Sequence, residues 1–257
     1  MRPRRRGSPS GQPLVPLSGV VFDFDGVLAD SEPLHLRAYQ DVLTPSGVNL
    51  TETDYYKRYL GFDDVGVFRA VAQDQGWILT EGLLTELVKT KGRRFDALAA
   101  KGAALFPGAA DCVRRLAAAV PIAMASGALR GEIETLLLPT GLRHHFKAIV
   151  ASGETPHSKP APDPYLRAVE LLRPFAIEAG LDPNGCFVAI EDSNWGVESA
   201  LAAGLRCVGV AQTYSADTLR DAQAVVDTIG ELGLEIVRGV CPNGSSDPNQ
   251  TTPESKP

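Results

Sequence analysis

A short apolar run that ends in two carboxylates and a glycine is the feature that most constrains the fold of this chain. Residues 20–22 are apolar and lead into Asp23, Asp25 and Gly26, a pattern that predicts a buried strand ending at a tight turn. Because side chains alternate along a strand, we expect Asp23 and Asp25 on the same side. Two carboxylates this close need a cation, a shared proton or a substrate group between them, unless both are solvated loop acids. The carboxyl end of a buried strand is also where open α/β sheets bind ligands.

The second half of the chain alternates helical patterns with short apolar strand patterns. This alternation predicts a parallel, doubly wound α/β sheet with helices on both faces, a Rossmann-like core made of residues 17–30 and 106–240. After the first strand, strands are expected over 121–125, 148–151, 186–190 and 207–211, and helices over 109–119, 130–138, 163–178 and 196–203.

Between the two parts of this core, residues 31–105 show helical patterns without strand alternation. Ser31 is expected to cap the first of these helices, which Pro45 and Gly47 then end. The sequence therefore predicts a helical segment inserted after the first strand. Its helices are expected over 32–43, 53–59, 65–74 and 81–100.

Both ends of the chain are polar and are expected to be disordered tails. Residues 1–16 are rich in Arg, Pro, Ser and Gly, and residues 241–257 are similarly polar. The N-terminal stretch carries no acid, so an organellar targeting segment is the alternative to a solvated tail. No apolar run approaches the ~20 residues needed to span a bilayer, and we expect no membrane partner.

The body of the chain is acidic. Without the four arginines of the N-terminal tail, 21 of the 25 basic residues remain against 31 acids, and the net charge falls from −6 to −10. An acidic chain with no basic stripe argues against a nucleic-acid partner. The four cysteines lack CxxC spacing, and Cys186 and Cys207 border apolar runs. We therefore expect buried free thiols rather than disulfides, and a cytoplasmic protein.

Three later segments also carry polar groups at strand ends or in a stiff loop. Ser126 and Gly127 end one expected strand, Glu191 and Asp192 end another, and Lys159 lies in a proline-rich loop. Adjacent acids at a strand end suit a hard cation such as Mg²⁺, which prefers oxygen ligands. Taken singly, each segment has a structural explanation as well: a turn or cap, an acidic helix start and a surface lysine.

In this order, the four segments resemble the motifs of the haloacid dehalogenase-like superfamily, in its phosphatase branch with a small helical cap. The resemblance covers residues 17–237 and implies that residues 31–105 form an inserted α-helical cap domain. It also implies that Asp23 attacks phosphorus and becomes an aspartyl-phosphate, while Asp25 acts first as general acid and then as general base. Ser126 would donate a hydrogen bond to a phosphoryl oxygen, and Lys159 would offset the charge around the nucleophile.

The same resemblance implies a magnesium cofactor. Asp23 and Asp192 would be direct ligands, together with the backbone carbonyl of Asp25. Glu191 would bind the ion directly or through a water molecule.

Substrate contacts are expected from His35 and Lys91 of the cap and from Gly127 of the core, with a merely structural role for His35 as an equal alternative. The resemblance includes both phosphoglycolate phosphatases and β-phosphoglucomutases. The cap loop of such a mutase carries an arginine for a second phosphate, whereas this chain offers Asp63 and Asp64 there.

We therefore expect a Mg-dependent phosphatase that acts on a small phosphorylated metabolite as a monomer or weak dimer. Two alternatives stay open. One is a sugar-phosphate mutase of the β-phosphoglucomutase type, and the other is a non-catalytic binding protein of the same fold.

Overall fold

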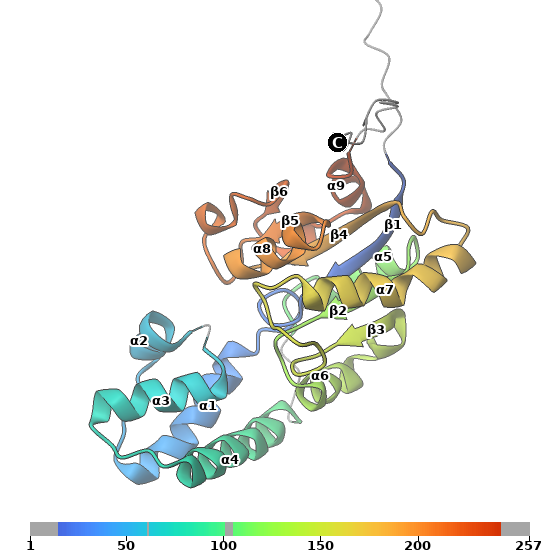
Figure 1. Ribbon diagram of the computed structural model, residues 1–257. Coiled ribbons are helices and arrows are strands. Elements are labelled where there is room, and N and C mark those ends of the chain that lie inside the picture. The colour runs from blue at the N-terminus through green and yellow to red at the C-terminus, as the bar shows by residue number, and fades with distance from the viewer. Residues whose placement is uncertain (1–14, 61, 101–104, 243–257) are drawn as a thin grey trace, which may run out of the picture.

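The centre of the fold is a six-stranded parallel sheet with the strand order β3-β2-β1-β4-β5-β6 (Figure 1). The computed structural model describes residues 15–60, 62–100 and 105–242. The first strand lies in the middle, and the chain builds outward from it in both directions, so the strand order reverses between β1 and β4. The strands are β1 (Leu17–Phe22), β2 (Ile122–Ala125), β3 (Phe146–Val150), β4 (Cys186–Glu191), β5 (Arg206–Val210) and β6 (Ala224–Val226).

Helices cover both faces of this sheet, which is why its strands are apolar on both sides. Alternate side chains of β1 enter different buried clusters: Val21 belongs to one, and Val20 and Phe22 belong to the other. The first cluster includes side chains of α7 (Asp163–Glu178) and α8 (Asn194–Ala202). The second includes side chains of α5 (Ala109–Ala117), α6 (Arg130–Leu137) and α9 (Leu234–Gly239). The doubly wound α/β core is therefore confirmed.

A helical cap is inserted between β1 and β2, as expected. It has a buried core of its own, in which Tyr39 packs against Tyr55 and Phe68. Figure 1 shows the cap beside the sheet, with the arrowhead of β1 pointing toward it. Its elements are α1 (Glu32–Leu43), α2 (Glu52–Asp54), a π-helical turn (Tyr55–Tyr59), α3 (Asp64–Gln75) and α4 (Glu81–Ala99).

The structure departs from the predicted elements where those elements are short. The helix expected over 53–59 is a single turn, α2, that continues into the π-helical turn. Neither β6 nor α9 is predicted, because three and six residues are too few to display a period. Within the described ranges, no helix combines the length and the apolar character needed to cross a membrane.

The expectation of free thiols is wrong for two of the four cysteines. Cys186, at the start of β4, forms a disulfide with Cys241, while Cys112 and Cys207 are buried and free. The partners are 55 residues apart, so the pairing depends on the fold rather than on a spacing that the sequence displays. With this bond, the cysteines no longer argue for a reducing compartment.

The inner edges of both expected tails also belong to the fold. The Val15 N–H donates to the Pro242 carbonyl (2.8 Å), and the Pro16 carbonyl accepts from the Cys186 N–H (2.9 Å). These bonds and the disulfide fasten the two ends of the described chain to the start of β4. The rest of the expected tails, residues 1–14 and 243–257, lies outside the described residues.

We predict that Cys241→Ser lowers the free energy of unfolding by ~2–4 kcal/mol under oxidising conditions, because the open loop regains conformational freedom in the unfolded state. Thermal or urea unfolding measures this change. A thiol reductant should bring the wild type to the stability of the variant and leave the variant unchanged. Equal stability of the two proteins without reductant would show that the bond does not form in solution.

Candidate active site

The carboxyl ends of β1, β2 and β4 bring the predicted polar residues to one place. Asp23 follows β1, and its N–H donates to the Ile190 carbonyl of β4 (2.9 Å), so the sheet pairing itself fixes its position. Ser126 follows β2 and is held in the same way by the Val150 carbonyl of β3 (2.9 Å). Glu191 is the last residue of β4 and Asp192 comes next, so both acids lie beside Asp23 at the reversal of strand order.

Lys159 reaches this site from the loop before α7. Its Nζ lies 2.5 Å from Asp23 Oδ1 and 2.6 Å from Glu191 Oε1, and all three side chains are buried. Burial alone would lower the pKa of Lys159, but the carboxylates of Asp23 and Glu191 raise it above its usual value. Lys159 is therefore a permanent cation that fixes the rotamers of two carboxylates.

Three carboxylates at this point can hold a metal ion. Asp23, Glu191 and Asp192 each offer an oxygen, and these atoms lie within 4.8 Å of one another. Burial raises the pKa of Asp23 to about 8 and that of Asp192 well above its usual range, so one lysine does not compensate the charge of the group. An all-oxygen donor set with a charge deficit fits a hard divalent cation such as Mg²⁺.

The oxygens of Glu191 are already engaged within the protein. Oε1 accepts from Lys159 and from the Tyr165 hydroxyl (2.6 Å), and Oε2 accepts from the Ser193 hydroxyl (3.2 Å). Sequence reasoning missed Tyr165, a buried aromatic residue of α7 whose hydroxyl role has no signal in the sequence. Glu191 is thus better placed to orient Lys159 than to coordinate an ion by itself.

Two glycines allow the acids to approach so closely. A Cβ on Gly26, whose φ is +75°, would lie 1.9 Å from Asp192 Oδ2. A Cβ on Gly196 of α8 would lie 2.0 Å from Glu191 Oε2. The turn at Gly26 is also held by Gln212, which donates to the carbonyls of Gly26 and Val27 (2.9 Å each). The sequence pattern gives the turn at Gly26 but not the contacts of Gly196 and Gln212.

Asp25 lies two residues after Asp23, in the turn that follows β1. It is half-buried, and its hydrogen-bond partners differ from those of Asp23. The Ser31 hydroxyl donates to Asp25 Oδ1, so the expectation that Ser31 caps α1 is wrong. Ser31 has helical backbone angles (φ −85°, ψ −18°) rather than the extended angles of a capping residue, which frees its side chain for Asp25. Burial raises the pKa of Asp25 to about 7. This carboxyl group can therefore exchange a proton near neutral pH.

The two cap residues expected to bind substrate lie together in the cap. Lys91 Nζ is 2.7 Å from His35 Nδ1 and 2.7 Å from Asp64 Oδ1, and Lys91 is fully buried. Burial and the neighbouring lysine hold the pKa of His35 well below its usual value, so the imidazole is neutral. Glu132 of α6 lies 3.9 Å from Lys91 across the boundary between cap and core. Sequence reasoning missed Glu132 as a partner of the cap.

Of the two core residues expected to contact substrate, only one is exposed. Gly127 faces solvent, whereas Ser126 is buried and its hydroxyl accepts from the Ala128 N–H (3.0 Å). The Ser126 hydroxyl proton stays free to be donated, because that contact uses only an oxygen lone pair.

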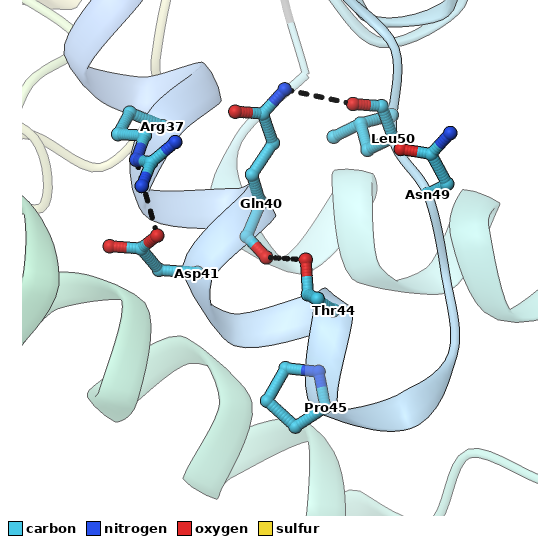
Figure 2. Close-up of a pocket in the computed structure, with 7 residues that line it drawn as sticks. All are labelled: Arg37, Gln40, Asp41, Thr44, Pro45, Asn49 and Leu50. Carbon is cyan, nitrogen blue, oxygen red and sulfur yellow. Dashed lines mark hydrogen bonds and ion pairs between the residues drawn. The ribbon is translucent and has the colours of Figure 1, made fainter.

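The cap also has a surface hollow, which none of the site residues described above lines. It is lined by residues of and after α1, and none of them is a predicted site residue (Figure 2). Its polar groups satisfy one another: Arg37 pairs with Asp41 (3.2 Å) and the Gln40 side chain donates to the Leu50 carbonyl (2.9 Å). The carboxylates and Lys159 therefore define the candidate active site.

Comparison with known proteins gives similarities that span most of the chain. The sequence model of the haloacid dehalogenase-like hydrolases matches residues 17–204. Fructose-1-phosphate phosphatase YqaB of Escherichia coli is 27% identical over 75% of this chain and 96% of its own length. The chloroplastic protein SUPPRESSOR OF QUENCHING 1 of Arabidopsis thaliana is 33% identical over 85% of this chain, which spans only 20% of that longer protein.

A solved structure is also similar. CbbY from Rhodobacter sphaeroides in complex with phosphate is 28% identical, with a TM-score of 0.70 over 84% of this chain and 96% of that one. A second structure of the same protein holds xylulose-(1,5)bisphosphate.

We predict that Gly26→Ala abolishes metal binding and enzymatic activity, since the new Cβ would displace the Asp192 carboxylate and strain the backbone. Isothermal titration with Mg²⁺ and an activity assay measure both losses. Gly131→Ala is the matched control, because that glycine lies in α6 with open space around it. The control should keep wild-type affinity. Unchanged Mg²⁺ affinity in Gly26→Ala would contradict the close approach of Asp192.

Proposed function

The chain belongs to the haloacid dehalogenase-like hydrolase family, and on that basis we propose that it is a Mg-dependent phosphatase of a sugar or polyol phosphate. The observation that carries the proposal is the contrast between two aspartates one residue apart. Asp23 is fixed by Lys159 within a cluster of acids, whereas Asp25 is bonded to a serine hydroxyl and has a pKa near neutrality. One is thereby suited to attack phosphorus and the other to transfer protons.

Asp23 is the nucleophile in this proposal. Its Oδ1 is held by Lys159, so its other carboxylate oxygen is left to attack the phosphorus of the ester. A bond forms from Asp23 to phosphorus as the bond from phosphorus to the alcohol oxygen breaks. Lys159 and the Ser126 hydroxyl stabilise charge on the phosphoryl oxygens.

Asp25 moves the protons. In the first half it gives a proton to the departing alcohol oxygen, and in the second it takes one from the water that attacks the aspartyl-phosphate. Inorganic phosphate leaves, and the Asp23 carboxylate is restored. A pKa of about 7 suits both directions of transfer.

Magnesium fits the cluster formed by Asp23, Glu191 and Asp192. When bound, it offsets the negative charge of the carboxylates and of the substrate phosphate. We propose Asp23, Asp192 and the backbone carbonyl of Asp25 as its direct ligands. Glu191 would act through water, because Lys159 and Tyr165 already occupy its Oε1.

The substrate class rests on the relatives and on the cap. One relative is named for fructose 1-phosphate, and another binds a xylulose bisphosphate. Hydrolysis is favoured over a mutase reaction because Asp64 of the cap loop already pairs with Lys91. A mutase must hold its bisphosphate intermediate through cations at that end. A non-catalytic role is disfavoured because each chemical position of the site is filled.

We predict that the wild type releases inorganic phosphate stoichiometrically from a sugar or polyol monophosphate. Asp23→Asn should lose nearly all activity, because the amide cannot attack phosphorus. Asp25→Asn should lower kcat by ~10²–10⁴-fold, since the amide cannot transfer protons. A phosphate-release assay with a panel of metabolites measures these effects, and circular dichroism checks that the variants stay folded.

Two outcomes would contradict the assignment. Substantial turnover by Asp23→Asn would exclude it as the nucleophile. Sugar-phosphate isomerisation that outpaces phosphate release, or activation by a sugar bisphosphate, would establish the mutase instead.

We also predict that a chelator abolishes activity and that Mg²⁺ restores it. Asp192→Asn should raise the Mg²⁺ concentration required for half-maximal activity more than Glu191→Gln does, because Asp192 is proposed as a direct ligand and Glu191 as a water-mediated one. Titration of activity with Mg²⁺ compares the two variants. An equal rise in both would overturn the distinction between a direct and a water-mediated ligand.

A further inference from the structure

Lys91 is a buried cation at the boundary between the cap and the catalytic core. A chain of contacts connects it to the proton-transfer group: Ser31 donates to Asp25, the His35 N–H donates to the Ser31 carbonyl (3.0 Å), and His35 Nδ1 lies 2.7 Å from Lys91 Nζ. A lysine in this position is suited to bind an anionic group on the leaving alcohol. Whether Lys91 can bind such a group depends on the side chains with which it already forms ion pairs.

Asp64 is the main partner of Lys91. It is the first residue of α3, and its Oδ1 lies 2.7 Å from Lys91 Nζ. The same oxygen accepts from the hydroxyl of Tyr39 (2.6 Å), a side chain that is only 2% exposed. Two buried donors therefore fix Asp64 in place, and this geometry is that of a built ion pair rather than a flexible surface contact.

The surroundings of the pair add negative charge. Glu132 lies 3.9 Å from Lys91, and the Glu32 carboxylate is held by the Tyr55 hydroxyl (2.6 Å) at the start of α1. One ammonium thus faces several carboxylates. A second phosphate brought to this end of the substrate would meet acids and a lysine that is already paired, which is costly in a partly buried site. A hydroxyl group would meet acceptors to which it can donate.

We propose that Asp64 is a specificity residue that pairs with Lys91 and thereby restricts the enzyme to monophosphates whose leaving group carries hydroxyls instead of a second phosphate. The inference rests on the proposed phosphatase function. It specifies in addition which charge the substrate carries at the end far from the reacting phosphate. Asp64 acts through Lys91, because it engages a cation at the boundary between cap and core that would otherwise bind the distal phosphate.

The neighbouring Asp63 provides a matched control. It carries the same charge one residue earlier, but its Oδ1 accepts from the Gly66 N–H (2.7 Å) and caps α3. Asparagine serves as a helix cap about as well as aspartate. Asp63→Asn therefore removes one negative charge from the same loop and leaves the Lys91 pair intact.

The test compares kcat/KM for fructose 1-phosphate and fructose 1,6-bisphosphate, with initial phosphate release as the readout. The wild type should prefer the monophosphate by at least about tenfold. Asp64→Asn should reduce this preference by at least about tenfold, mainly through a lower KM for the bisphosphate. Asp64→Glu should retain the preference, and Asp63→Asn should behave as the wild type. An unchanged ratio in Asp64→Asn, or an equal change in Asp63→Asn, would overturn the proposal.

Asp64→Asn leaves a buried lysine without its main partner and could fail to fold. A double variant keeps the proposal testable in that case. Asp64→Asn combined with Lys91→Gln removes both charges, and the preference for the monophosphate should then match the wild type. If the double variant favours the bisphosphate, Lys91 is not the group that Asp64 controls.

Different results would contradict the phosphatase function and the role of Asp64. Absence of phosphate release from p-nitrophenyl phosphate and from every sugar monophosphate would count against the phosphatase. Equal kcat/KM of the wild type for the two fructose phosphates would leave the phosphatase intact and overturn the role of Asp64.

Discussion

The contact between a buried lysine and two carboxylates organises the candidate active site at the end of the sheet. Lys159 touches Asp23 of the first strand and Glu191 of the fourth, and it comes from the loop that leads into α7. Three segments far apart in the sequence therefore meet at one ammonium group. The contact forms only because β1 and β4 are neighbours, which follows from the reversal of strand order between them.

A single turn separates two chemical environments in this site. Asp23 shares the cluster of acids and the lysine, while Asp25 lies past the strand end and is bonded to Ser31, the residue that leads into the cap. Asp25 is thus linked to the cap, and Asp23 is linked to the sheet. A movement of the cap would change the surroundings of Asp25 more than those of Asp23.

The sequence was sufficient for the fold class and for placing the acids at one edge of the sheet, because both depend on local patterns. Apolar strands that end in Asp23 or Glu191 are visible as short runs, and parallel strands bring their carboxyl ends together. The partners that face one another across the fold were not visible. The bond of Cys186 to Cys241, the donation of Ser31 to Asp25 and the contact of Gly196 with Glu191 each depend on distances that no sequence period encodes.

The joining of the two ends of the described chain has a consequence for how this unit fits into larger proteins. Val15 and Pro242 are hydrogen-bonded to each other at the amino ends of the strands, about 20 Å of strand away from the acids. The unit therefore has the geometry of an insertable module: a host chain could enter and leave through adjacent points without crossing the cap or the catalytic end. The plant relative, of which this chain spans 20%, is an example of a related sequence within a longer polypeptide.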